Sequence, residues 1–160
     1  MALLAMKNRS VRIILFHGDA IFEVPHSHAQ SLQESGQEEP AQLAPAVIFE
    51  YCPFGDVECF ISKWHPVLTQ TIIYHWTRHV AEGLQFLASF NIVHADLIPK
   101  IILVRADKTL VVADLGRSFV ATTPQNTHRF RATVSSAWPE ILRQTGINPA
   151  AELFSLGLIV

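Results

Sequence analysis

The chain has 160 residues, of which 49% are apolar and 16% charged, and its net charge is −2. This composition is typical of one globular domain with a substantial core, and not of a disordered chain. A charge so close to neutral provides no electrostatic basis for binding nucleic acid or an anionic membrane, and no uninterrupted apolar stretch is long enough to span a bilayer. Cys52 and Cys59 form no disulfide framework. We therefore expect a reducing compartment, the cytoplasm or the nucleus.

The first third of the chain predicts short strands separated by a polar loop. Apolar runs at Val11–Phe16 and Ala20–Val24 predict two strands with a turn at His17-Gly18-Asp19 between them. Residues 25–45 are rich in Gln, Glu, Ser, Pro and Ala and have no apolar periodicity, which indicates a flexible insertion loop. Ala46–Tyr51 then predicts a third strand.

Two helices are expected next. Val57–Trp64 can form a short one, and Thr69–Phe90 carries the clearest periodic pattern of the chain. Apolar residues recur there at spacings of three and four, at Ile72, Trp76, Val80, Leu84 and Leu87. Thr69 can cap the start of this helix, and Asn91 can adopt the left-handed conformation that ends it.

Two aspartates lie at the edges of β-like runs in the following segment. His94-Ala95-Asp96 follows an apolar pair, and Asp114-Leu115-Gly116 follows the second of two predicted strands, Ile101–Val104 and Leu110–Ala113. Such a pair is commonly found in phosphoryl-transfer sites, where one Asp orients a hydroxyl nucleophile and the other holds Mg²⁺ against the phosphates.

The last third is polar from Phe119 to Ser136, after which a helix is expected near Trp138-Pro139-Glu140 and an apolar helix from Leu153. In this order the motifs resemble those of a eukaryotic protein kinase domain of the Ser/Thr type. Glu152 to Gly157 is similar to the helix start that anchors the catalytic loop in that family. Thr133 falls on the Thr typical of Ser/Thr kinases.

The resemblance implies an α+β fold made of the end of the small lobe and the first half of the mainly helical large lobe. Residues 1–160 would then be a partial kinase domain, with residues 25–45 as an insertion and with the start of the small lobe and the end of the large lobe absent. It implies ATP and Mg²⁺ as ligands. Asp96 would be the catalytic residue, and Asp114 the metal ligand.

The resemblance also implies contacts with the nucleotide. Glu50 and Cys52 would belong to the hinge that binds the adenine, next to Phe49 at the back pocket. Asp56 would contact the ribose, and Leu103 would form the floor beneath the adenine.

Several positions depart from the family pattern. Ile101 replaces the Asn that is a second metal ligand, and an aliphatic side chain cannot bind Mg²⁺. Ile98 replaces the Lys that steadies the transferring phosphate, and Ala95 replaces the Arg of His-Arg-Asp. The Gly-rich loop, the strand Lys and its helix Glu have no counterpart. We therefore expect weak nucleotide binding and impaired transfer. Lys100 is close enough in sequence to compensate, although a solvated side chain is the expectation.

Two other functions stay open. A catalytically inactive pseudokinase fragment could act as a protein-binding module, and a small-molecule phosphotransferase of the aminoglycoside or choline kinase type also carries a His-x-Asp loop. Trp138-Pro139-Glu140 and Ser155-Leu156-Gly157 argue against the second. The expected partners are a protein substrate or a docking protein. Leu153, Phe154, Leu156, Leu158, Ile159 and Val160 are expected to expose an apolar patch that permits self-association.

His75 and His79 lie one helical turn apart, as two zinc ligands would. The helix lacks the Glu of a His-Glu-x-x-His motif, so ordinary helix histidines are expected.

Overall fold

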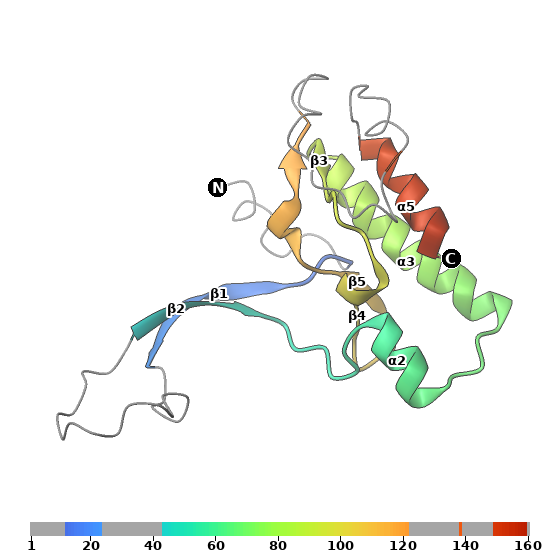
Figure 1. Ribbon diagram of the computed structural model, residues 1–160, viewed down its shortest axis with the longest axis horizontal. Helices are drawn as coiled ribbons and strands as arrows, with labels where there is room; N and C mark the ends of the chain where they lie inside the picture. The colour runs from blue at the N-terminus through green and yellow to red at the C-terminus, as the bar shows by residue number, and fades with distance from the viewer. Residues whose placement is uncertain (1–11, 24–42, 122–137, 139–148, 160) are drawn as a thin grey trace, which may run out of the picture. The chain divides into compact units, whose positions relative to one another are not determined.

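The computed structural model describes residues 12–23, 43–121, 138 and 149–159 (Figure 1). These residues belong to two compact units. The smaller unit comprises residues 15–50, and the larger comprises residues 1–14 and 51–160. No helix in the described part of the chain is long and apolar enough to cross a membrane.

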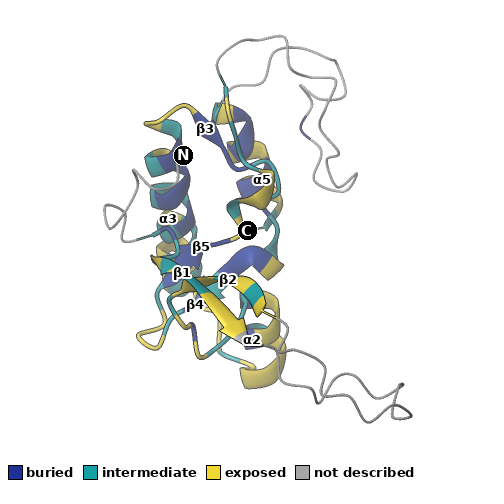
Figure 2. Cartoon of the chain, turned by 90° about the vertical axis from the view of Figure 1, so that its left-hand side faces the viewer, coloured by how far each residue is buried: buried dark blue, intermediate teal, exposed yellow. Residues whose placement is uncertain are grey.

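The smaller unit is a β-hairpin. Strand β1 (Phe16–Glu23) pairs antiparallel with β2 (Leu43–Phe49), from Phe16 opposite Phe49 to Glu23 opposite Leu43. Figure 2 shows that β2 is exposed along much of its length. The exposed side chains of the hairpin include Ile21 and Phe22 of β1 and Val47 and Phe49 of β2.

The prediction of two strands before the loop was wrong at the turn, because β1 runs through His17-Gly18-Asp19 without a break. The register shifts between Phe16 and Gly18, and Gly18 has a φ of 151°. Glycine adopts that angle without steric cost, so the chain forms a bulge there instead of a reversal. Strand β2 begins at Leu43, inside the predicted loop, whose residues 25–42 lie outside the described part of the chain.

The larger unit is built around helix α3 (Gln70–Ala88). The Thr69 hydroxyl oxygen accepts a hydrogen bond from the N–H of Ile72 at 3.3 Å, so the predicted cap is confirmed. Asn91 has a φ of 55° and is left-handed, as expected. Helix α2 (Val57–Trp64) also forms where the sequence predicted it.

Two short sheets lie in the described part of this unit. Strand β4 (Ile102–Val104) pairs antiparallel with β5 (Leu110–Val112), which confirms the predicted strand pair. Strand β3 (Ile92–Val93) pairs antiparallel with β6 (Phe119–Val120). This second pair was not predicted, because two-residue strands are too short to show a periodic pattern.

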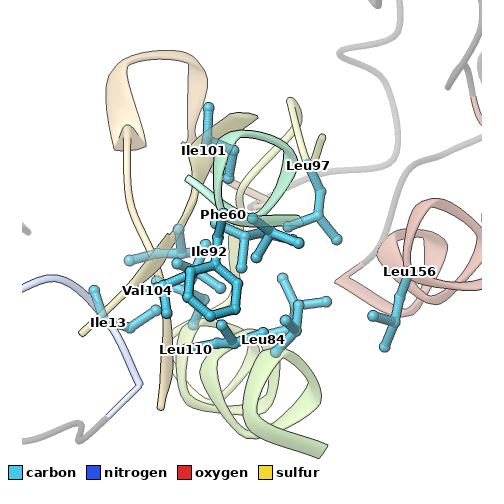
Figure 3. Packing of buried hydrophobic residues seen from close by; sticks show 14 residues of the cluster. Ile13, Phe60, Leu84, Ile92, Leu97, Ile101, Val104, Leu110 and Leu156 are labelled. Atoms are coloured by element: carbon cyan, nitrogen blue, oxygen red, sulfur yellow. The ribbon is translucent and has the colours of Figure 1, made fainter. Parts of the chain in front are cut away.

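The core of the larger unit lies between α3, α2 and the β4–β5 sheet (Figure 3). Val80, Leu84 and Leu87 of α3 are buried in it. Gly83 permits close packing against the segment before β1. A Cβ there would lie 3.0 Å from the Arg12 carbonyl oxygen and 3.2 Å from Val112 Cγ2.

Helix α5 (Glu152–Ile159) packs against α3 (Figure 1). Leu156 is buried in the main core, so its predicted exposure was wrong. Leu153, Phe154 and Leu158 are exposed. Val160 lies outside the described residues.

Candidate functional site

The ring of His94 connects the loop after β3 with the end of β5. His94 is fully buried, and its Nε2 lies 2.8 Å from the Ala113 carbonyl oxygen. Its Nδ1 accepts a hydrogen bond from the Asp96 N–H at 3.4 Å, so Nε2 carries the proton that is donated to Ala113. Burial lowers the pKa of His94, which keeps the imidazole neutral and preserves this arrangement.

The two aspartates singled out by the sequence both interact electrostatically with His94. The negative charges of both aspartates partly offset the effect of burial on the pKa of His94, which remains lowered overall. Both carboxylates therefore lie within electrostatic range of the same ring. The Asp96 side chain is only 14% exposed. Asp114 is exposed, directly after the sheet formed by β4 and β5.

Asp114 adopts an uncommon backbone conformation. Its φ of 54° and ψ of 70° are left-handed, which costs a non-glycine residue roughly 1 kcal/mol. Its Oδ1 accepts a hydrogen bond from the Gly116 N–H at 3.2 Å and so caps the 3₁₀ turn η3 (Leu115–Arg117). The turn aims the chain back toward β6 and leaves the carboxylate at the surface.

Glu152 anchors the loop that carries Asp96. Its Oε1 accepts hydrogen bonds from the N–H groups of His94 at 2.6 Å and Ala95 at 3.0 Å. Ala95 is left-handed, with a φ of 68°, and the Glu152 carboxylate helps to hold it there. This contact is the one that the similarity of residues 152–157 to an anchoring helix start implied.

The Glu152 carboxyl group is itself in an unfavourable environment. The residue is 1% exposed, and within the described residues its Oε2 has no hydrogen-bond partner. Burial raises its pKa to about 7, although the two N–H donors favour the ionised form.

Arg117 contacts the candidate catalytic residue. Its Nη1 donates to Asp96 Oδ1 at 3.1 Å. Arg117 was not among the predicted site residues, because the β3–β6 pairing that brings it to Asp96 was not predicted.

Two residues expected to contact the nucleotide lie side by side. Asp56 and Leu103 form an antiparallel bridge, and the Val104 N–H donates to the Gly55 carbonyl oxygen at 2.8 Å. Asp56 also caps α2, since its Oδ1 accepts from the Cys59 N–H at 2.8 Å. Burial raises the pKa of Asp56, but its hydrogen bonds with Cys59 outweigh this effect and lower it overall.

The hinge candidates have structural contacts of their own. The buried Cys52 accepts a hydrogen bond at its carbonyl oxygen from the Gly55 N–H at 3.1 Å, which closes the turn before α2. Glu50 belongs to the smaller unit. Its N–H donates to the Leu15 carbonyl oxygen, and its Oε1 accepts from the Leu15 N–H, both at 2.8 Å.

The structure buries aliphatic side chains at the positions that depart from the kinase pattern. Ile101 is 9% exposed and belongs to the core, as Figure 3 shows, and Ile98 packs against that core. Lys100 is exposed, and its charge acts on Cys59. Asp114 can therefore supply one carboxylate ligand to Mg²⁺, a number that suits a magnesium ion bound together with nucleotide phosphates.

A buried hydrogen bond joins α5 to Trp138. Trp138 donates from Nε1 to the Ser155 hydroxyl oxygen at 2.6 Å, and both residues are buried. Trp138 also packs with Val93 and Ala151 in a second small core. Pro139, Glu140 and Thr133, which belong to the predicted motifs, lie outside the described residues.

Comparison with known families decides the assignment. The profile of the family described as "Protein kinase domain" matches residues 23–160, most of the chain. The chain belongs to the protein kinase family. The predicted α+β kinase fold is thereby confirmed, and Asp96 and Asp114 fall within the matched region of the kinase domain.

The relatives of this kinase domain are much longer proteins. The chain is 26% identical over 115 residues to mitogen-activated protein kinase kinase kinase dlk-1 of Caenorhabditis briggsae, covering 71% of the chain and 13% of that protein. It is 32% identical over 117 residues to the cyclin-dependent kinase 4 homolog of Caenorhabditis elegans, covering 71% and 28%. With serine/threonine-protein kinase ATG1a of Arabidopsis thaliana the identity is 28% over 117 residues, covering 71% and 18%.

Proposed function

We propose that this kinase domain performs ATP-dependent phosphorylation of Ser or Thr in proteins, at an impaired rate. The observation that carries the proposal is the buried His94, whose ring hydrogen-bonds to the Asp96 N–H and to the carbonyl oxygen of Ala113, the residue before Asp114. Asp96 would orient the hydroxyl nucleophile, and Asp114 would bind the Mg²⁺ that accompanies the phosphates. Glu152 supports the proposal because its two hydrogen bonds hold the loop of Asp96 in place.

Impairment follows from the charge balance of the site. Phosphoryl transfer depends mainly on positioning and on charge stabilisation. Ile98 and Ile101 provide neither a cation nor a metal ligand, and their packing in or against the core prevents other side chains from using that space.

The expected nucleotide contacts follow from the family resemblance. We assign the adenine contacts to Glu50 and Cys52, the ribose contact to Asp56 and the floor of the site to Leu103. The pairing of Asp56 with Leu103 supports the last two assignments. With one carboxylate for Mg²⁺, binding of Mg·ATP is expected to be weak.

The test is transfer of labelled γ-phosphate from Mg·ATP to a general protein substrate. The unmodified chain should transfer phosphate at a slow but measurable rate. Asp96→Asn and Asp114→Asn should each reduce this rate to background. Asp107→Asn is the matched control, since Asp107 caps the β4–β5 turn by accepting hydrogen bonds from Thr109. A chain no faster than its Asp96→Asn variant would overturn the proposal of transferase activity.

That outcome would favour a catalytically inactive protein-binding module in the cytoplasm or nucleus. One observation supports this second candidate: the exposed apolar side chains Leu153, Phe154 and Leu158 share helix α5. They would bind a partner protein or a second copy of the chain. Sedimentation should then show association that weakens in a Leu153→Ser, Phe154→Ser double variant. A chain that sediments as a monomer at all concentrations would exclude self-association.

A further inference from the structure

The contact between Arg117 and Asp96 follows from the pairing of β3 with β6. In that antiparallel pair Val93 lies opposite Phe119. Asp96 comes shortly after Val93, and Arg117 comes shortly before Phe119, so the register brings their backbones to the same end of the pair. The ion pair at 3.1 Å is therefore fixed by local topology.

The turn that carries Arg117 is held at both ends. Asp114 caps it through the Gly116 N–H, and both the N–H and the hydroxyl group of Ser118 donate to the Leu115 carbonyl oxygen, at 3.1 Å and 2.6 Å. Arg117 nevertheless keeps a side chain that is 55% exposed. The backbone of Arg117 is thus held in place, while its guanidinium group remains accessible to a ligand.

The negative charges near Arg117 favour a cation at this position. Asp96 and Asp114 both contribute negative charge, and a nucleotide brings several more. Ile98, which stands where the family places a Lys, carries no charge. A guanidinium group has five N–H donors in a planar fork, so it can remain paired with a carboxylate and still donate to a phosphate oxygen.

We infer that Arg117 binds the γ-phosphate of bound ATP while it remains paired with Asp96. It thereby supplies the positive charge that Ile98 cannot. This inference rests on the proposed function and deepens it, since it assigns a phosphate-binding residue to the site. Bound this way, Arg117 brings the phosphate to the carboxylate that orients the attacking hydroxyl.

The experiment compares the affinities for Mg·ATP and Mg·ADP, measured by titration of the whole chain and followed by NMR chemical shifts. In Arg117→Ala the affinity for Mg·ATP should fall about tenfold, as expected for one charge-assisted hydrogen bond, while the affinity for Mg·ADP changes little. Arg117→Lys should recover part of the loss. Arg78→Ala is the matched control, because it removes the same charge and a comparable exposed ion pair, with Glu82 on α3.

The ratio of the two affinities separates a binding role from a structural one, because local unfolding would weaken both ligands equally. An unchanged ratio in Arg117→Ala would overturn the inference and leave the proposed function standing. Tighter binding of Mg·ATP in that variant would also overturn it, since Arg117 would then compete with the nucleotide. If the unmodified chain binds neither nucleotide, the proposed function fails, and the inference fails with it.

Discussion

Replacing Glu152 tests whether one buried carboxyl group controls the loop of the candidate site. Glu152→Ala removes the acceptor of two N–H groups, those of His94 and Ala95. A buried donor without a partner costs about 1–3 kcal/mol, so two such donors and a small cavity should lower the free energy of unfolding by about 3–5 kcal/mol. Glu152→Gln keeps an acceptor oxygen and the shape of the side chain, so its loss should be smaller.

The pH dependence of stability provides a sharper measurement. The pKa of Glu152 rises from 4.5 in the unfolded chain to about 7 in the folded one. Because the pKa is raised, the contribution of Glu152 to the free energy of unfolding is fully present below pH 4.5 and is lost as the pH rises through 7. Because each unit of pKa corresponds to about 1.4 kcal/mol, the wild-type chain should lose roughly 2–3 kcal/mol from this group between about pH 5 and pH 8.

The assay is urea unfolding followed by tryptophan fluorescence at several pH values, for the wild-type chain and for Glu152→Gln. The difference in unfolding free energy between them should shift in favour of the variant as the pH rises. Glu82→Gln is the control. Hydrogen bonds from Arg12 and Arg78 lower the pKa of Glu82 below 4.5, so its contribution to stability is lost only at lower pH, and its difference from the wild type should stay constant between about pH 5 and pH 8. A constant difference between Glu152→Gln and the wild type across this range would refute the reasoning.

Three further predictions concern packing, pH and ligand binding. Gly83→Ala should lower the free energy of unfolding in urea by about 1–3 kcal/mol, because a Cβ would press on the Arg12 carbonyl oxygen and on Val112; an unchanged midpoint would contradict this. His79 accepts a hydrogen bond at Nδ1 from the Leu110 N–H, and burial lowers its pKa below 6.5. The contribution of His79 to the free energy of unfolding is therefore lost as the pH falls through that lowered value. The free energy of unfolding of His79→Gln should decrease less at acid pH than that of the wild type. Mg·ATP at millimolar concentration should stabilise the chain by no more than about 0.4 kcal/mol in a thermal shift assay, the value for a ligand at its Kd, so a large shift at micromolar nucleotide would show that one carboxylate suffices for tight binding.

The elements that the sequence predicted well are those whose own residues determine them. Helix α3 has a periodic apolar face and a Thr cap, and both are local properties that tertiary packing reinforces. The β1–β2 hairpin was harder, because Gly18 fits a reversal and a bulge equally well, and only the pairing with β2 decides between them.

The candidate site shows the same division. His94, Asp96 and Asp114 were identifiable because each lies in a short motif next to an apolar strand. Arg117 was not, because its proximity to Asp96 depends on the pairing of two strands of two residues each. The cap that Asp56 provides for α2 was also missed, although an Asp directly before an apolar helix is a typical cap.

The hydrogen bond between Glu152 and His94 joins residues that are 58 positions apart in the chain. Closing a loop of that length has an entropic cost that must be met before the contact contributes any stability. Helix α3 and the β4–β5 hairpin depend on nearer neighbours and can form earlier. During synthesis the loop of Asp96 therefore leaves the ribosome well before the residue that fixes its shape, so this loop should acquire its final geometry after helix α3 has formed.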